Sequence, residues 1–369
     1  MIRIYFWQVM ITPHISSLAL ELSKNGYEIF YVSQIYLSKD RMNIGWEVSN
    51  LGNVKIHMVK NLQDVNSIIS NAHSNSIHIC QGIRNNGLIY YAQKEIRKKK
   101  LRQWVIMETV NDNGFFGFIK RILYKYLIKK YQKDIEIILA IGWRTSDWLI
   151  KLGMESKRVF PFTYFLPKNK EVSKIVKKEN NLLSFIFIGS LVKNKKVDLL
   201  ILALSKLSNY EFELIVVGDG PERRNLQKYA EVLIPGRTVW KGTIKMRDIN
   251  NILFGCDCLV LPSIHDGWGA VVSEAMINGV PAVCSDTCGA AEVVKLSGYG
   301  GVFKSKDLNG LIYQLHKVAK KGSISEKDRS NLSSWSKKIT SEAGSEYLLN
   351  IINYSNGVNK KPIPPWIKK

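Results

Sequence analysis

A chain of 369 residues is longer than one hydrophobic core usually fills, so two domains are expected. With 46% hydrophobic and 23% charged residues, the composition is that of an ordinary globular protein and excludes an intrinsically disordered one. The formal net charge of +22 is unusual for that class, and it favours anionic partners such as phosphates, nucleic acid or an acidic membrane surface.

Short apolar runs alternate with amphipathic helical patterns along nearly the whole chain, which is typical of parallel α/β sheets. The predicted strands of the first half are residues 3–8, 28–34, 54–59, 76–82, 103–109 and 136–142. Those of the second half are residues 184–189, 212–218, 238–242, 257–263 and 281–286. The predicted fold class is therefore α/β, with two doubly wound Rossmann-like domains that face each other across a ligand cleft.

The predicted domain boundaries follow changes in composition. Residues 1–168 form an N-terminal domain and residues 183–335 a C-terminal domain, joined by a polar and charged linker at 169–182. Residues 336–369 are predicted as a helix that returns towards the N-terminal domain, followed by a basic tail. Because residues 360–369 are rich in proline and lysine, we expect an extended arm there rather than a packed element.

Cysteine usage and hydropathy limit the cellular setting. The five cysteines show no metal-binding spacing, so we expect buried reduced thiols, which suit the cytoplasm, and no metal site. The N-terminus lacks a signal-peptide cleavage site, and no run of about 18 apolar residues could span a bilayer. Any membrane contact is therefore expected to be peripheral.

One predicted helix combines bulky apolar residues with a dense set of cations. It covers residues 117–131 and carries Lys120, Arg121, Lys125, Lys129 and Lys130. Such a helix can bury one apolar face and present a cationic face to an anionic membrane. A core-packed helix with solvated lysines is the alternative.

The densest functional pattern lies at residues 262–281, where a strand ends, a glycine-rich turn follows and a helix begins. Gly267 and Gly269 allow the backbone to approach a ligand, and the helix offers unpaired N–H groups. That combination predicts a diphosphate site. Asp266 and Glu274 bracket the turn, and their carboxylates can accept hydrogen bonds from sugar and ribose hydroxyls. Alternatively, Asp266 caps the helix and Glu274 is solvated.

This stretch resembles the signature of glycosyltransferase family 4, within glycosyltransferase group 1. The matching residues are Asp266, Gly267, Trp268, Gly269, Glu274, Ala275, Gly279 and Pro281. The glycine loop at residues 189–198, the turn after residues 212–218 and the strand end at 239–242 also resemble the family, so the similarity spans about residues 184–303. The resemblance implies the GT-B fold and a retaining transfer of a sugar from a nucleoside diphosphate, without a metal or another cofactor.

The resemblance also implies roles for individual residues. Glu274 would bind the ribose hydroxyls, Asp266 the hydroxyls of the transferred sugar, and Lys195 the diphosphate, whose charge grows as the glycosidic bond breaks. The complete donor-binding set that it implies is Gly189, Ser190, Lys195, Gly218, Gly242, Thr243, Gly267, Trp268, Gly269, Ala270, Val271 and Glu274.

Three departures from the family pattern are visible. The first acid is Asp266 where glutamate is usual, so its carboxylate is one methylene shorter. Ser190 occupies the place of a usual arginine, and Lys193 and Lys196 are both candidates to replace that charge. The glycine-rich turn that usually follows the first strand is absent.

Two residues of the N-terminal half are candidates for contact with the acceptor. His14 follows the first strand and Glu108 lies near the end of the strand at 103–109, so both are expected at the ligand edge of the sheet. Either could orient or deprotonate an acceptor hydroxyl. A capping or packing role is the alternative for each, and the family often has a histidine near the position of Glu108.

The predicted function is transfer of a sugar to a lipid-linked or membrane-associated saccharide of a bacterial surface polysaccharide, such as O-antigen, lipopolysaccharide, capsule or exopolysaccharide. The enzyme is expected in the cytoplasm, on the inner face of the plasma membrane, with no nucleic-acid partner. A nucleotide-sugar epimerase of the same architecture is one alternative. A nucleic-acid-binding protein is the other, motivated by the charge of +22, but no nucleic-acid-binding signature occurs.

Overall fold

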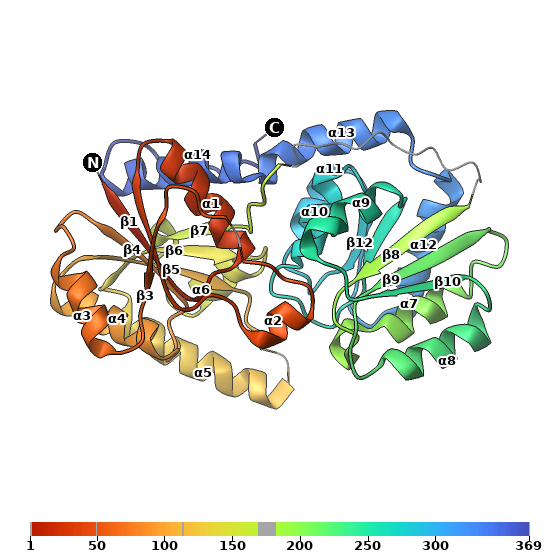
Figure 1. The fold of residues 1–369 in the computed structure, drawn as a ribbon, viewed down its shortest axis with the longest axis horizontal. Coiled ribbons are helices and arrows are strands. Elements are labelled where there is room, and N and C mark those ends of the chain that lie inside the picture. Colours follow the sequence, from red (N-terminus) through yellow and green to blue (C-terminus); the bar gives the residue numbers. More distant parts are fainter. Residues whose placement is uncertain (1, 49, 113, 169–181, 369) are drawn as a thin grey trace. The chain divides into compact units, whose positions relative to one another are not determined.

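The computed structural model describes residues 2–48, 50–112, 114–168 and 182–368, which form two compact units (Figure 1). The first unit consists of residues 1–38, 48–167 and 341–369, and the second of residues 39–47 and 168–340. The predicted linker at 169–182 lies outside the described residues except for Leu182. Each unit contains one parallel sheet, and the two are described separately below.

The sheet of the first unit has seven strands in the order β3-β2-β1-β4-β5-β6-β7. They are β1 (Arg3–Met10), β2 (Glu28–Ile35), β3 (Lys55–Met58), β4 (Ile77–Gln81), β5 (Arg102–Glu108), β6 (Ile135–Ile141) and β7 (Val159–Phe162). All six predicted strands are present. The seventh, β7, was not predicted, because this edge strand has only four residues and contains Pro161.

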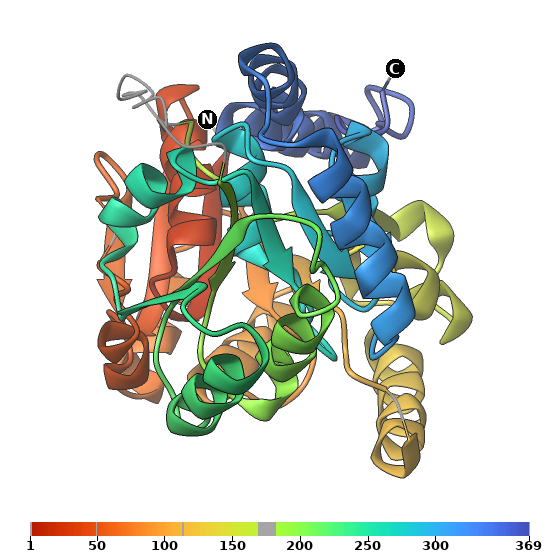
Figure 2. The same ribbon diagram turned by 90° about the vertical axis from the view of Figure 1, so that its right-hand side faces the viewer.

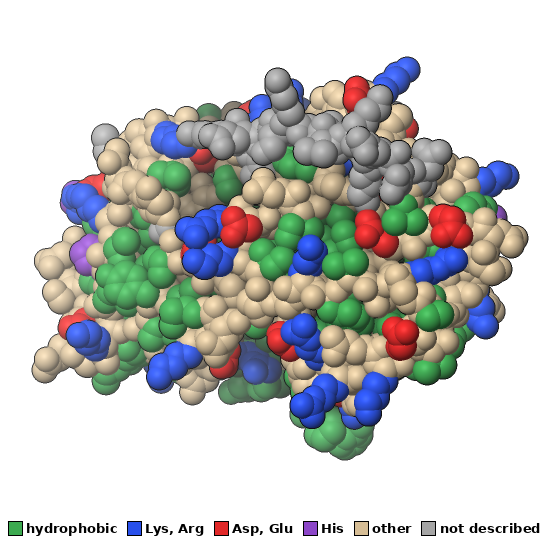
Figure 3. Space-filling model, turned by 45° about the vertical axis from the view of Figure 1, so that its right-hand side comes forward, with side chains coloured by type: hydrophobic (Ala, Val, Ile, Leu, Met, Phe, Trp, Pro, Cys, Tyr) green, Lys and Arg blue, Asp and Glu red, His purple; other side chains and the backbone are tan. Residues whose placement is uncertain are grey.

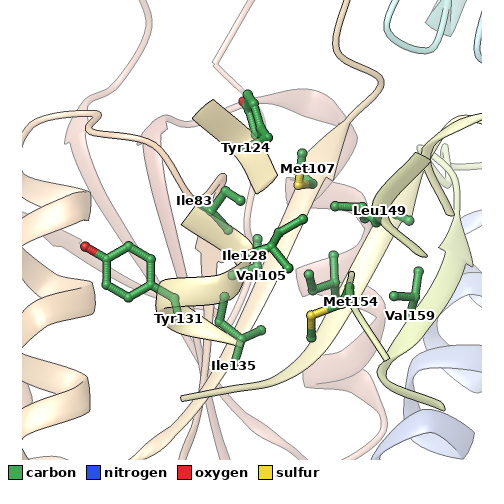
Figure 4. Close-up of a cluster of buried hydrophobic side chains, with 12 residues drawn as sticks. Ile83, Val105, Met107, Tyr124, Ile128, Tyr131, Ile135, Leu149, Met154 and Val159 are labelled. Carbon is green, nitrogen blue, oxygen red and sulfur yellow. The ribbon is translucent and has the colours of Figure 1, made fainter. Parts of the chain in front are cut away.

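Helices cover both faces of this sheet (Figures 1 and 2). They are α1 (Pro13–Lys24), α3 (Leu62–Ser70), α4 (Leu88–Lys98), α5 (Gly114–Tyr131), α6 (Thr145–Lys151) and α14 (Ser341–Ser355). On one face, Tyr124 and Ile128 of α5 form a buried cluster with Val105 of β5 and Ile135 of β6 (Figure 4). On the other face, α1 packs against α14, although more than 300 residues separate them in the sequence.

The second unit has a six-stranded sheet in the order β10-β9-β8-β11-β12-β13. The strands are β8 (Leu183–Ile188), β9 (Phe212–Val217), β10 (Thr238–Gly242), β11 (Cys258–Leu261), β12 (Ala282–Ser285) and β13 (Gly301–Phe303). Its α-helices are α2 (Lys39–Asn43), α7 (Val197–Leu204), α8 (Arg223–Leu233), α9 (Ile249–Phe254), α10 (Ala270–Ile277), α11 (Ala291–Ser297), α12 (Leu308–Lys321) and α13 (Glu326–Ser336). The predicted five strands are confirmed, and the three-residue edge strand β13 was missed.

The segment of residues 39–47 belongs to the second unit, although it lies between β2 and β3 in the sequence. The backbone N–H of Met246 donates to the carbonyl of Gly45 at 2.9 Å. Gly45 has a φ of +87°, and a Cβ there would lie 2.1 Å from the carbonyl oxygen of Ile244. Glycine is therefore required for this close approach to the loop that follows β10.

The C-terminal tail is packed, so the prediction of an extended arm is wrong. Trp366 is only 3% exposed, and its ring lies 6.0 Å from that of Phe165 and 6.2 Å from that of Tyr347. The Nζ of Lys361 donates to the carbonyl of Val159 at 2.9 Å. One buried tryptophan supplies more apolar area than the surrounding prolines and lysines suggest.

Helix α5 is present as predicted and buries one apolar face, but that face is narrower than expected. Its buried residues are Gly117, Tyr124, Ile128 and Tyr131, which form a narrow stripe. The large apolar residues that α5 exposes are Phe115, Phe116, Phe118, Ile119, Ile122, Leu123 and Tyr126. In Figure 3, hydrophobic side chains flanked by lysine and arginine gather at the lower end of the molecule, where α5 lies in Figures 1 and 2.

Candidate functional site

The loop between β11 and α10 contains the predicted diphosphate site. Gly269 is the N-cap residue of α10 and has a φ of +83°. A Cβ at this position would lie 2.6 Å from the Sγ of Cys288 and 2.9 Å from a methyl group of Leu261. Only glycine satisfies both the backbone conformation and the packing. The first N–H groups of α10, from Ala270 onwards, therefore lie directly after a tightly constrained turn.

A second loop, which follows β12, supports this turn. The N–H of Gly289 donates to the carbonyl of Asp266 at 3.0 Å, and the N–H of Ala290 donates to the carbonyl of Trp268 at 2.8 Å. The thiol of Cys288 also donates to the carbonyl of Trp268, at 3.0 Å. A Cβ on Gly289 would lie 2.1 Å from the carbonyl oxygen of Gly267. Sequence reasoning missed this supporting loop, although Gly289 was a possible signal of close backbone approach.

The side chain of Trp268 has a structural role. It is 3% exposed, and its indole Nε1–H donates to the hydroxyl of Ser273 at 3.0 Å. Because the ring is buried and its one donor is used, only the backbone of Trp268 remains for contact with a ligand.

Lys195 and Asp266 are brought together by tertiary structure. The Lys195 Nζ lies 2.5 Å from the Asp266 Oδ2, and their side chains are 23% and 16% exposed. Two hydrogen bonds of Asn194 hold the lysine loop in place. Its carbonyl accepts from the N–H of Ile264 at 2.8 Å, and its Nδ2 donates to the carbonyl of His265 at 2.9 Å. The lysine predicted to bind the diphosphate and the carboxylate predicted to bind sugar hydroxyls therefore lie in direct contact.

Glu274 lies on the second turn of α10 and is partly buried. Burial raises the pKa of its carboxyl to about 7. Within the described ranges, its carboxylate has neither a hydrogen-bond donor nor a cation. A partly desolvated carboxylate without donors is unfavourable, and a ligand such as a pair of ribose hydroxyls would supply them.

The other predicted donor residues lie at the carboxyl ends of β8, β9 and β10. The N–H of Gly189 donates to the carbonyl of Val217 at 3.0 Å, and that of Gly218 donates to the carbonyl of Gly242 at 2.7 Å. A Cβ on Gly218 would lie 2.0 Å from the carbonyl oxygen of Gly189, so these loops are in direct contact. Ser190 and Thr243 are the next residues of two of them.

The loop that contains Ser190 also contains Lys193 and Lys196, the two candidates to replace the missing arginine charge. The Nζ of Lys196 lies 2.5 Å from the Oδ2 of Asp198, so its charge is already paired. Lys196 has a left-handed backbone, with a φ of +52°. These observations favour Lys193 over Lys196 as a replacement for the arginine that the family usually has at Ser190.

In the first unit, Tyr164 contacts both residues that were predicted to face the acceptor, His14 and Glu108. The ring of Tyr164 stacks on that of His14 with centroids 4.5 Å apart, and its hydroxyl donates to the Oε1 of Glu108. His14 is the second residue of α1, Glu108 ends β5, and Tyr164 lies two residues beyond β7. Sequence reasoning missed Tyr164, because β7 itself was not predicted.

No group of three metal-binding side chains occurs among the residues that the structure describes. All five cysteines are buried free thiols, as predicted. Across the described ranges, no helix is both long enough and apolar enough to cross a membrane.

Residues 168–338 match the family model described as "Glycosyl transferases group 1". The match covers less than half of the chain, and it says what this part of the chain is similar to. The group 1 region contains Lys195, Asp266 and Glu274 together with every other residue of the predicted donor set, so the resemblance read from the sequence is confirmed at the level of the family.

Curated relatives agree with this assignment. An uncharacterized glycosyltransferase of Methanocaldococcus jannaschii is 30% identical over 112 residues, which are 30% of this chain and 29% of the relative. The putative teichuronic acid biosynthesis glycosyltransferase TuaC of Bacillus subtilis is 25% identical over 172 residues, which are 45% of this chain and 42% of TuaC. The match therefore spans less than half the length of these relatives.

The solved structure of HepE from Anabaena, in complex with UDP, resembles this chain over its whole length. The TM-score is 0.74 at 14% sequence identity, covering 96% of this chain and all of HepE. At that identity the likeness concerns the fold alone. The predicted GT-B class, with two Rossmann-like domains, is confirmed.

Proposed function

We propose that the protein is a retaining glycosyltransferase that moves a sugar from a nucleoside diphosphate to a hydroxyl of a saccharide acceptor. One observation carries this proposal: Lys195 and Asp266 form an ion pair beside the turn that begins α10, and Glu274 lies on the second turn of that helix. HepE and TuaC support it, since HepE was crystallised with UDP and with UDP-glucose, and TuaC is named as a glycosyltransferase.

In this proposal the turn before α10, Lys195, Asp266 and Glu274 each have a defined role. The diphosphate accepts hydrogen bonds from the first N–H groups of α10, where the helix dipole favours negative charge. Lys195 offsets the charge that grows on the departing nucleoside diphosphate as the bond to the sugar breaks. Asp266 accepts hydrogen bonds from the transferred sugar, and Glu274 accepts them from the ribose. None of these steps requires a metal ion.

We further propose that the acceptor is lipid-linked or membrane-associated and belongs to a bacterial surface polymer. Helix α5 supports this part, because Phe115 and Phe116 are 74% and 77% exposed and several lysines lie on the same helix. Apolar side chains inserted at the headgroup level, with cations beside them, bind an anionic membrane. The protein would then act at the inner face of the plasma membrane without spanning it.

The first experiment is a thermal-shift screen with UDP, GDP, dTDP and their sugar conjugates. A nucleotide that binds the folded protein raises its melting temperature, since ligand binding to the folded state alone stabilises it. The best donor is then incubated with and without octyl glycosides, and the products are identified by mass spectrometry and by the anomeric coupling constant. Transfer with the donor's anomeric configuration supports the proposal.

Two outcomes of this experiment count against it. Epimerised donor in the tube without acceptor indicates the alternative activity on the same architecture. Failure of every nucleotide to raise the melting temperature, combined with tight and steeply salt-dependent binding of a mixed oligonucleotide, indicates a nucleic-acid-binding protein instead.

A further inference from the structure

The carboxyl edge of the first sheet presents polar side chains on the face covered by α1 and α14. In the strand register, Glu108 of β5 is the partner of Ile141 on β6, which is the partner of Phe162 on β7. Side chains in one row of a parallel sheet point to the same face. The ring of Phe162 stacks on Tyr347 of α14 with centroids 6.0 Å apart, which identifies that face.

Tyr164 follows Phe162 by two residues and returns to Glu108. Its hydroxyl donates to the Glu108 Oε1, while its ring stacks on His14 at the start of α1. A carboxylate at the end of β5, an aromatic ring beyond β7 and an imidazole after β1 therefore form one cluster. The end of β5, the start of α1 and the segment after β7 supply it, and all three lie at the carboxyl edge, where doubly wound sheets bind ligands.

A second observation on the same face points to a ligand. Gln8 lies on β1, where Tyr5 and Trp7 point to the opposite face, against α3 and α4. Gln8 is only 3% exposed, and its Nε2 has no hydrogen-bond partner among the described residues. Buried amide donors are rarely left in this state, and the oxygen of a bound polyol is a suitable acceptor.

We propose that Tyr164 is a positioning residue of a sugar-hydroxyl subsite in the first unit, where it orients the Glu108 carboxylate towards the acceptor. This inference rests on the proposed function and assigns a site within it. A carboxylate offers about four lone-pair directions, so it accepts the tyrosine O–H and a sugar hydroxyl together. The stacked His14 restricts the tyrosine ring, which keeps the direction of its O–H bond fixed.

The test uses variants that separate the hydroxyl of Tyr164 from its ring. Tyr164→Phe keeps the stacking on His14 and removes only the hydrogen bond to Glu108. Glu108→Gln removes the charge that accepts it. Tyr91→Phe is the matched control, because its hydroxyl donates to Asn66 between two helices, away from the subsite.

Two measurements are made on each full-length variant. The affinity for a panel of octyl glycosides, namely the β-glucoside, β-galactoside and N-acetyl-β-glucosaminide, is measured by saturation-transfer NMR. The affinity for the nucleotide selected in the thermal-shift screen is measured by calorimetry. Tyr164→Phe is expected to weaken binding of the preferred glycoside about tenfold, as for a lost hydrogen bond to a charged group. Nucleotide affinity and the control are expected to stay within twofold of wild type.

A protein that carries both Tyr164→Phe and Glu108→Gln distinguishes a positioning role from a merely structural one. The quantity compared is its affinity for the glycoside. If Tyr164 acts through Glu108, the double variant binds the glycoside no more weakly than Glu108→Gln alone. Equal affinity in Tyr164→Phe and wild type, strictly additive losses, or no glycoside binding to the wild type would each overturn the subsite. Intact nucleotide binding in those cases shows that the proposed function survives without it.

Discussion

The ammonium group of Lys195 and the carboxylate of Asp266 form an ion pair of 2.5 Å across 71 positions of sequence. Both partners have ligand roles in the proposed function, one for the diphosphate and the other for the sugar. A donor that binds there competes with this pair, because the carboxylate and the diphosphate share the charge of one ammonium group. Substitutions of Lys195 and of Asp266 are therefore expected to change the affinity for the nucleotide in opposite directions.

Lys195→Ala is expected to weaken binding of UDP by roughly 10- to 150-fold, since charge-assisted hydrogen bonds contribute about 1.5–3 kcal/mol. Asp266→Asn is expected to strengthen it by about two- to fivefold, because the diphosphate no longer competes with a partly exposed ion pair. The same Asp266→Asn protein should transfer sugar poorly. Titration calorimetry with UDP measures both effects, and Lys206→Ala, an exposed lysine at the end of α7, is the control. Weaker binding in both variants would contradict the competition.

Glu274→Gln is expected to change stability and ligand binding in opposite directions. Burial raises the pKa of Glu274 from 4.5 to about 7. Between pH 4.5 and pH 7 the carboxyl is therefore protonated in the folded state and ionised in the unfolded state. The stability of the wild type therefore falls as the pH rises through this window, by roughly 3 kcal/mol in total. The glutamine variant should match wild type near pH 4 and be more stable at pH 8, while binding UDP more weakly there. Denaturant melts and calorimetry at both pH values check this.

The affinity of the wild type for uridine should also rise with pH up to about 7, because the ionised carboxylate accepts hydrogen bonds from the ribose. Uridine is used here because it carries no phosphate that titrates in the same range. The Glu274→Gln variant should lack this dependence. A pH dependence that persists in the variant would assign the titration to another group.

Gly269→Ala is expected to destabilise the second unit by roughly 1–3 kcal/mol and to weaken nucleotide binding. Two causes combine here, namely a φ of +83° and a Cβ within 2.6 Å of Cys288. Gly298→Ala separates them, since Gly298 has a φ of +74° with no atom within 4 Å of its Cβ position. The Gly298→Ala control should lose less stability than Gly269→Ala, because only the backbone conformation is unfavourable there. Equal losses in urea melts would show that the contact with Cys288 is relaxed by movement of the loop.

The double substitution Phe115→Ser and Phe116→Ser should reduce binding to phosphatidylglycerol vesicles at least tenfold. Each phenylalanine contributes about 1.5–3 kcal/mol when it leaves water, and both are largely exposed in the folded protein. The melting temperature should change little for the same reason. Val232→Ser, at a position that is 78% exposed on α8, is the control in vesicle co-sedimentation. Vesicle binding that survives the double substitution would place the membrane contact elsewhere or remove it.

The sequence alone determined the two parallel sheets, most of their strands and the position of the glycine turn before α10. Buried parallel strands are apolar throughout, and a turn that approaches a ligand needs glycine, so both features are local and visible in the order of residues. The edge strands β7 and β13 were not predicted, because four and three residues are too few to show a strand pattern. The tail was misjudged because its single buried tryptophan is a tertiary contact.

Only the tertiary structure decided how the functional side chains combine. The pairing of Lys195 with Asp266, the support of the donor turn by Gly289 and the bridge from Glu108 through Tyr164 to His14 all join residues far apart in sequence. The same is true of the raised pKa of Glu274, since burial depends on what packs around a residue. Sequence periodicity reports the face on which a side chain lies, whereas contact and desolvation depend on elements that only folding brings together.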